Sequence, residues 1–165
     1  MQNDLTSIVE TVVKTVVSQQ PAHKCKCKKL TLALAKKLAE KVEAKASEIG
    51  VKAVVAVSDS GARPILVECM DDAYIASYDI ALNKAYTVVS LKMNTSRLKK
   101  LSQPGEPLYG IQFTNSGQIV IFGGGEPLRY GDKVIGGLGV SGGSEEQDTF
   151  LASYGAEVFE ELINS

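Results

Sequence analysis

The chain has 165 residues and a mass of 17.6 kDa, the size of one globular domain with a short appendage, and a second full domain would not fit. Its 18 basic and 19 acidic side chains nearly cancel to a formal net charge of -1, so the composition does not indicate a nucleic-acid-binding protein. Apolar runs are all far shorter than the roughly 20 residues of a membrane span. The sequence therefore predicts a cytoplasmic protein with neither a nucleic acid nor a membrane as partner.

The first residues predict a separate amphipathic helix. Residues 1–20 place apolar side chains at helical spacing, and residues 21–29 are polar, basic and interrupted by Pro21, as in a linker. An isolated helix of about 15 residues is marginal in water, so another surface must cover its apolar stripe. We expect an N-terminal helix (1–20), a basic linker (21–29) and one domain (30–165).

The first part of this domain is glycine-poor and predicts helices with one hairpin. Thr31 is an expected N-cap for a helix that ends at Gly50. The elements expected after it are a strand over Val51–Val57, a turn over Ser58–Gly61, a strand over Pro64–Met70, and helices over Ala73–Leu91 and Thr95–Leu101.

The second part is rich in glycine, since twelve of the 15 glycines lie between Gly105 and Gly143. Three strands are expected here, over Gln118–Phe122, Leu128–Tyr130 and Lys133–Val140, with Gly123–Pro127 as a turn. Ser144 and Gln147 form a predicted capping box for the last helix. The element order indicates an α+β domain with helices packed on an antiparallel sheet.

A glycine motif at the end of the last strand suggests an anion site. Gly137 to Gly142 match G-x-G-x-x-G, but only one helix follows the motif, and this context does not fit a dinucleotide-binding unit. The Gly142 and Gly143 amides at the start of that helix still predict a corner for a carboxylate or phosphate.

The linker contains donors for a metal or for haem. His23, Cys25 and Cys27 offer imidazole and thiolates, and the alternative is a flexible basic linker without a ligand. The three cysteines are an odd number, which favours reduced thiols. The single histidine excludes a Ser-His-Asp triad or a multi-histidine metal centre in the core.

One helix face combines small residues with a lysine. Ser77, Ala81, Lys84 and Thr87 share one side of the helix predicted over Ala73–Leu91. One interpretation is packing on the sheet or on another subunit, with Lys84 reaching toward solvent. The other is a pocket wall in which Lys84 pairs with an acidic ligand.

Over about residues 30–163 the sequence resembles the GlcG/HbpS family, which includes the C-terminal domain of PduO-type proteins and is often labelled haem-binding or haem-degrading. The matching blocks are Leu30-Thr31-Leu32, Val57-Ser58-Asp59-Ser60-Gly61, Met70-Asp71, Ala81-x-x-Lys84-Ala85-x-Thr87, Gly123-Gly124-Gly125-Glu126-Pro127-Leu128 and Ile135-Gly136-Gly137-Leu138-Gly139-Val140-Ser141-Gly142-Gly143. The family usually has Arg before Met-Asp and Gly after it, where this chain has Cys69 and Asp72. The charge of that arginine is missing here.

The resemblance implies a profilin-like fold of α-β-α layers with a five-stranded antiparallel sheet, a homo-oligomer (tetramer or octamer), and haem as the cofactor. No catalytic set transfers to this chain. The iron ligands that the chain offers are His23, Cys25, Cys27, Cys69, Met70, Met93 or a tyrosine. Lys84 or Arg129 would meet the haem propionates, and Gly142 and Gly143 are the remaining candidate cofactor-binding residues.

Residues 1–20 are similar to the encapsulation peptides that direct enzymes into bacterial microcompartments, with shell or cargo proteins as partners. The alternative is a helix for oligomerisation or for docking on the domain itself. We therefore expect an accessory tetrapyrrole-binding protein, with haem as the ligand, in a microcompartment lumen for diol or related metabolism. The alternatives are an enzyme or binding protein for a small carboxylate or diol-derived metabolite, using Lys84, Gly142 and Gly143, and a structural assembly factor.

Overall fold

The computed structural model describes residues 28–165, so the helix predicted over 1–20 and nearly all of the linker lie outside the described residues. Within that range the chain forms four α-helices, two short 3-10 helices and four strands. In chain order they are α2 (Leu32–Glu48), β1 (Val54–Asp59), β2 (Pro64–Cys69), α3 (Ile75–Leu91), α4 (Thr95–Leu101), η1 (Ile111–Phe113), η2 (Asn115–Gly117), β3 (Gly125–Tyr130), β4 (Lys133–Ser141) and α5 (Glu145–Asn164).

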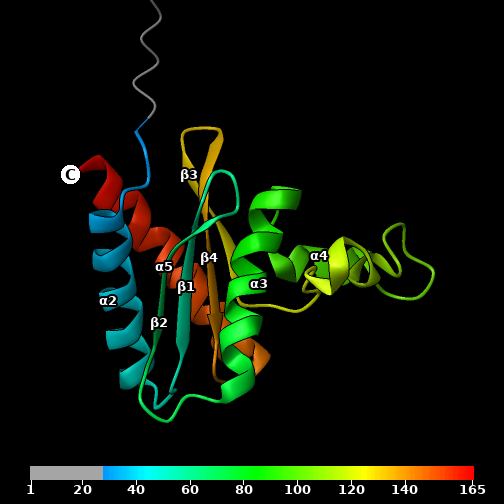
Figure 1. Cartoon of the computed structure of the whole chain (residues 1–165), viewed down its shortest axis with the longest axis horizontal. Coiled ribbons are helices and arrows are strands. Elements are labelled where there is room, and N and C mark those ends of the chain that lie inside the picture. The colour runs from blue at the N-terminus through cyan, green and yellow to red at the C-terminus, as the bar shows by residue number, and fades with distance from the viewer. Residues whose placement is uncertain (1–27) are drawn as a thin grey trace, which may run out of the picture.

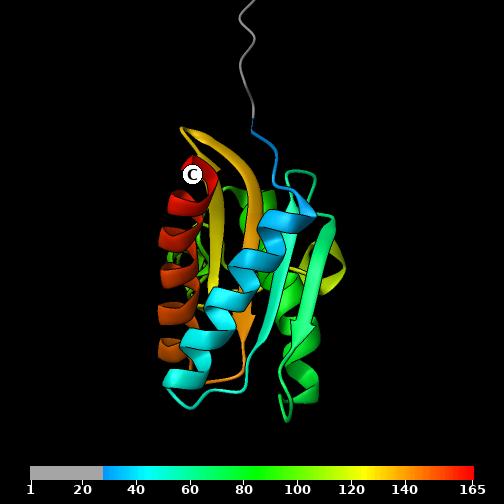
Figure 2. The same ribbon diagram turned by 90° about the vertical axis from the view of Figure 1, so that its left-hand side faces the viewer.

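The elements form three layers. The sheet has the order β2-β1-β4-β3 with every neighbouring pair antiparallel. Helices α2 and α5 lie side by side on one face of the sheet, and α3 covers the other (Figures 1 and 2). The predicted α+β class and the α-β-α layering are confirmed.

The predicted fifth strand is wrong. Residues 118–122 form no strand, although Ile119 and Val120 are buried as a strand would require. The Val120 amide donates to the Thr87 hydroxyl at 3.0 Å, so a side chain of α3 satisfies it in place of a neighbouring strand. The glycine run after it is also not simply a turn, because β3 already begins at Gly125.

The predicted cap residues of α2 and the predicted start of α5 are confirmed. The Thr31 hydroxyl accepts from the Leu34 amide at 3.2 Å, and Gly50 follows the helix with a positive φ of 72°. Ser144 and Gln147 form both halves of the capping box. These local signals place the two helices that close one face of the sheet.

Helix α3 begins with large apolar side chains that point outward. Ile75 is 96% exposed and Tyr78 is 46% exposed, whereas Ser77, Ala81 and Lys84 are buried against the sheet. This close packing requires glycine in the facing strand β4. A Cβ atom at Gly139 would lie 2.7 Å from the Ala85 amide nitrogen and nearer still to the Ala81 carbonyl oxygen. The packing interpretation of this helix face is therefore the one that the structure adopts.

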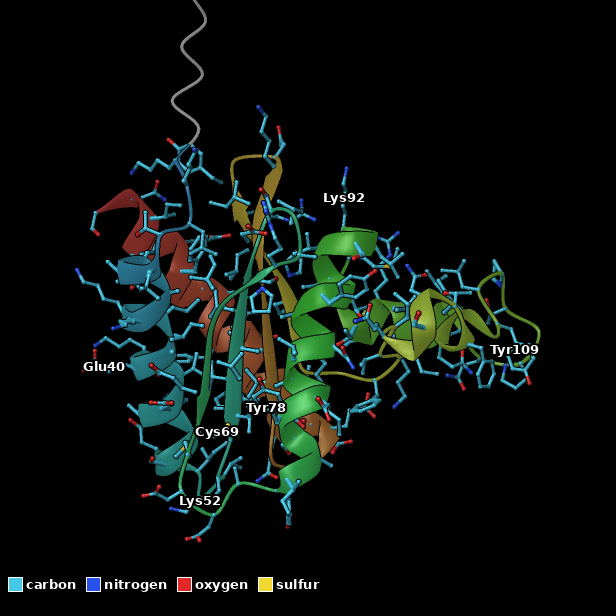
Figure 3. The ribbon with its side chains drawn as sticks, in the orientation of Figure 1. Glu40, Lys52, Cys69, Tyr78, Lys92 and Tyr109 are labelled. Carbon is cyan, nitrogen blue, oxygen red and sulfur yellow. The ribbon has the colours of Figure 1, made fainter. Side chains whose placement is uncertain are left out.

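The segment from α4 to η2 extends away from the layered body as an arm, and Tyr109 lies near its far end (Figure 3). Tyr109 and Phe113 on this arm are exposed. No helix in residues 28–165 has the length and apolar character to span a membrane.

Candidate functional site

A buried ion pair connects α3 to α5. The Lys84 ammonium donates to Asp148 Oδ2 at 2.7 Å and to the Val140 carbonyl at 2.8 Å. The two side chains are 0% and 4% exposed, and the ammonium also lies 4.8 Å from the centre of the Phe122 ring. Lys84 therefore does not reach solvent, and the acid that it pairs with belongs to the chain itself.

The same carboxylate meets the Gly142-Gly143 corner. Asp148 Oδ1 accepts from the Gly142 amide at 3.1 Å and from the Gly143 amide at 3.0 Å. Asp148 lies in the first turn of α5, where the helix dipole favours a negative charge. The corner has the chemistry expected of an anion site, and an internal carboxylate fills it.

Burial shifts the pKa of Lys84. Desolvation lowers the pKa of Lys84 from its usual value, and the nearby charge of Asp148 opposes that effect. A Cβ atom at Gly124 would lie 2.6 Å from the Lys84 ammonium nitrogen, so glycine at this position leaves the space that the ammonium fills. The glycine blocks around residues 124 and 142 thus build the surroundings of an internal ion pair.

A second acidic side chain anchors the preceding glycine. Glu145 accepts from the Gly123 amide at 2.9 Å and from the Lys99 ammonium at 2.5 Å. The hydrogen bond from Lys99 is the main reason that the pKa of Glu145 is lowered. Glu126 behaves oppositely, because burial raises its pKa although Asn94 and Ser153 donate hydrogen bonds to it.

The remaining predicted site residues are divided between the two ends of the sheet. Met70 is half-buried just after β2, and the Ala53 amide donates to its sulfur at 3.3 Å. Lys52 and Cys69 lie at this same end of the molecule (Figure 3). A pocket of about 490 Å³ here includes Lys52, Gly142 and Gly143 in its lining.

Arg129 lies at the opposite end, where the described chain begins. Its guanidinium donates to the Lys92 carbonyl at 3.2 Å and to the Asp132 carbonyl at 3.5 Å. Asp148 therefore joins Lys84 to the Gly142-Gly143 corner, whereas Arg129 lies apart from both.

A pocket at this end was not anticipated from the sequence. Figure 1 shows the β1–β2 turn, the β3–β4 turn and the start of the described chain at one end of the molecule. The pocket is lined by residues from all three segments and has a volume of about 480 Å³. We call it the turn pocket. Its lining residues are Lys28, Lys29, Leu30, Asp59, Ser60, Arg63, Lys133, Val134 and Ile135.

The predicted haem ligands have very different surroundings. Cys69 is an exposed thiol on the edge strand β2, and Met93 is half-buried after α3. Tyr74 and Tyr109 are exposed. His23, Cys25 and Cys27, the expected imidazole and thiolate donors, lie outside the described residues.

Asp148 is the main residue that sequence reasoning missed. The sequence does contain a signal for its role. Asp148 is an acidic residue in the first turn of a capped helix, and two glycines precede that helix, so its carboxylate is well placed to accept hydrogen bonds from their amides. Arg63 and Lys133 were missed because they flank two hairpin turns that are far apart in the sequence.

Comparison with known proteins identifies the family. The profile of the family described as "Haem degrading protein HbpS-like" matches residues 30–157. A 15.0 kDa protein from the dhaT-dhaS intergenic region of Citrobacter freundii is 52% identical over 133 residues, which cover 81% of this chain and 94% of that protein. The corrinoid adenosyltransferase PduO of Citrobacter freundii is 39% identical over 108 residues, which cover 66% of this chain and 32% of PduO.

Among solved structures, the crystal structure of a PduOC:haem complex has a TM-score of 0.76 at 35% identity, covering 79% of this chain and 94% of that one. These matches confirm the resemblance carried by the sequence blocks. The chain spans about a third of PduO, so the activity of that whole enzyme does not follow from the match. The chain belongs to the HbpS-like family.

Proposed function

We propose that this protein binds haem as an accessory protein, at the end of the domain where the described chain begins. The observation that carries the proposal is the turn pocket, which Lys28 and Lys29 help to line. In the sequence these two lysines directly follow the segment with the candidate iron donors His23, Cys25 and Cys27. A PduOC:haem complex among the similar structures supports the choice of ligand.

The residues at this end have the chemistry to bind haem, and the candidate iron donors are close enough to the turn pocket along the chain to reach it. The turn pocket combines cationic side chains with the apolar residues Leu30, Val134 and Ile135, as an amphiphilic anion requires. Cys27 is next to Lys28, and His23 is five residues away, so its Cα lies at most about 18 Å from that of Lys28. Bound haem would supply an iron that takes imidazole or thiolate as axial ligand. The protein would bind the propionate carboxylates of haem and shield one edge of the porphyrin ring from water.

Titration of the purified full-length chain with haemin tests this proposal. We expect a saturable, shifted Soret band in the wild type, and a weaker band in a variant with His23→Ala, Cys25→Ser and Cys27→Ser. The matched control is Cys69→Ser, which removes an exposed thiol at the opposite end and should leave the band unchanged. Absence of a Soret shift in the wild type would refute haem binding.

We further propose that the protein is a homo-oligomer, such as the expected tetramer or octamer. Support comes from apolar side chains that one copy leaves exposed at the start of α3, namely Tyr74, Ile75 and Tyr78. Light scattering coupled to gel filtration measures the assembly. A monomer at micromolar concentration would contradict it.

Location in a microcompartment is the third part of the proposal. It rests on the amphipathic pattern of residues 1–20 and on the similarity to PduO. Residues 1–20 fused to a fluorescent protein should co-localise with shell proteins, whereas the chain lacking them should stay diffuse. Identical distributions of the two would rule out targeting by this segment.

The residues proposed for the alternative, an enzyme or binding protein for a small carboxylate, already bind an internal carboxylate. That alternative relied on Lys84 and the Gly142-Gly143 amides, and all three contact Asp148. The observations on residues 28–165 therefore favour the haem-binding proposal.

A further inference from the structure

We infer that the turn pocket is a dicarboxylate site, which holds the two propionates of a tetrapyrrole. This inference rests on the proposed function and names the part of the chain that recognises the ligand. The cations of the turn pocket take the place of Lys84 and Arg129, which the family resemblance had suggested as partners of the propionates. Lys84 is buried against Asp148, and the Arg129 guanidinium donates to two backbone carbonyls.

The charge of the turn pocket favours a dianion. The lining residues Lys28, Lys29, Arg63 and Lys133 carry four positive charges, and Asp59 carries one negative charge. The Lys28 ammonium donates to the Ile163 carbonyl and lies 5.7 Å from the centre of the Tyr130 ring, so it adds to the positive charge of this end from a position that is already occupied. A dicarboxylate would therefore enter a region of net positive charge.

Asp59 is already engaged within its own turn. Its carboxylate accepts from the Gly61 amide at 2.8 Å and from the Arg63 amide at 2.9 Å, and the Arg63 amide is the main cause of its lowered pKa. The contact with the Arg63 guanidinium is longer, at 3.3 Å, and the arginine side chain is 83% exposed. Arg63 can thus turn toward a ligand while Asp59 stays bound to the two amides.

The apolar part of the lining distinguishes a tetrapyrrole from a small anion. Leu30 is buried, and Val134 and Ile135 are half-buried, so these side chains form a wall beside the cations. A free phosphate would use the cations alone, whereas the edge of a porphyrin ring would also cover the wall.

The sheet holds the two turns in place. Strands β1 and β4 remain paired up to Asp59 and Gly136, directly beside the turn pocket. A Cβ atom at Gly136 would lie 2.5 Å from the Ser58 carbonyl oxygen and would collide with the Leu30 side chain. Glycine at 136 therefore allows Leu30 to pack against the strand and to form the base of the wall.

Iron-free protoporphyrin IX tests this inference apart from axial ligation. Its fluorescence anisotropy is measured with the wild-type chain and compared with that of its dimethyl ester, which lacks the negative charges. We expect the diacid to bind at least tenfold more tightly than the ester. Arg63→Gln with Lys133→Gln should weaken diacid binding about three- to tenfold and leave ester binding unchanged, because each exposed ion pair contributes modestly.

The matched control is Lys36→Gln with Lys100→Gln, which removes two exposed lysines outside the turn pocket and should not change either affinity. Circular dichroism checks that each variant is folded. Equal affinity for diacid and ester, or equal losses in both double variants, would overturn the inference. Displacement of the diacid by equimolar inorganic phosphate would also overturn it, because the apolar wall would then contribute nothing.

The two proposals can fail separately. A haemin Soret shift without preference for the diacid would leave haem binding intact and refute the propionate site. Preference for the diacid without a Soret shift would support the dicarboxylate site and refute axial ligation of haem by this chain.

Discussion

Replacing Asp148 by asparagine tests whether the Lys84–Asp148 pair determines the stability of the domain. Asparagine keeps an oxygen that can accept from the Gly142 and Gly143 amides, so Asp148→Asn removes the negative charge and preserves the corner. The Lys84 ammonium then lies fully buried with the Val140 carbonyl as its remaining strong acceptor among these groups.

The expected loss is large because a buried charge remains without its partner. Removing one member of a buried ion pair typically costs about 3–5 kcal/mol. Lys84→Met should cost less, about 1–3 kcal/mol, because Asp148 keeps two amide donors and its place at the N-terminus of α5. The double variant should be more stable than Asp148→Asn alone, since no unpaired ammonium is left in the core.

Urea unfolding followed by far-UV circular dichroism measures these free energies, because the chain contains no tryptophan for fluorescence. All variants are compared at one protein concentration, so that any self-association contributes equally. Asp79→Asn is the matched control, since it makes the same replacement at an exposed position of α3 and should change the free energy of unfolding by less than about 0.5 kcal/mol.

Two results would refute this account. A loss below about 1 kcal/mol for Asp148→Asn would mean that water or another group compensates the Lys84 charge. A double variant whose loss equals the sum of the two single losses would mean that the two side chains are not energetically coupled.

Gly139→Ala should destabilise the domain by at least about 1–3 kcal/mol, because the new Cβ would collide with the α3 backbone. The control is Gly61→Ala in an exposed turn, where a Cβ would lie 3.2 Å from a side-chain atom. Equal losses of unfolding free energy in urea for the two variants would contradict the close packing of α3 on β4. Glu126→Gln tests the raised pKa of Glu126: the folded state holds this proton to higher pH than the unfolded state, so Glu126 lowers stability as pH rises from about 4.5. The stability of Glu126→Gln relative to wild type should therefore increase over that range in unfolding curves, and a constant difference would exclude this pKa shift.

Local signals allowed much of the fold to be predicted. Thr31 and Gly50 marked the ends of α2, and Ser144 with Gln147 marked the start of α5, because caps depend on residues a few positions apart. The strand expected over 118–122 failed for a tertiary reason. Its apolar residues are buried, but Thr87 from α3 supplies a hydrogen-bond partner that no local pattern reveals.

The orientation of α3 also needed tertiary information. Ile75 and Tyr78 have the spacing of a core-facing stripe, yet they face outward because small residues such as Ala81 fit against the glycines of β4. The sequence did identify Lys84, Gly142 and Gly143 as groups that would meet an acid. It did not identify the acid, since Asp148 is 64 residues from Lys84 along the chain.

The separation of Lys84 from Asp148 has a consequence for the order of folding. Helix α3 is synthesised well before α5, so its lysine has no partner carboxylate while the later strands are being made. An ammonium group without a partner carboxylate needs hydration, and the closed packing of α3 on the sheet leaves no access for water to Lys84. The final closure of α3 therefore has to wait for α5, and we expect the two opposite faces of the sheet to be completed in one cooperative step.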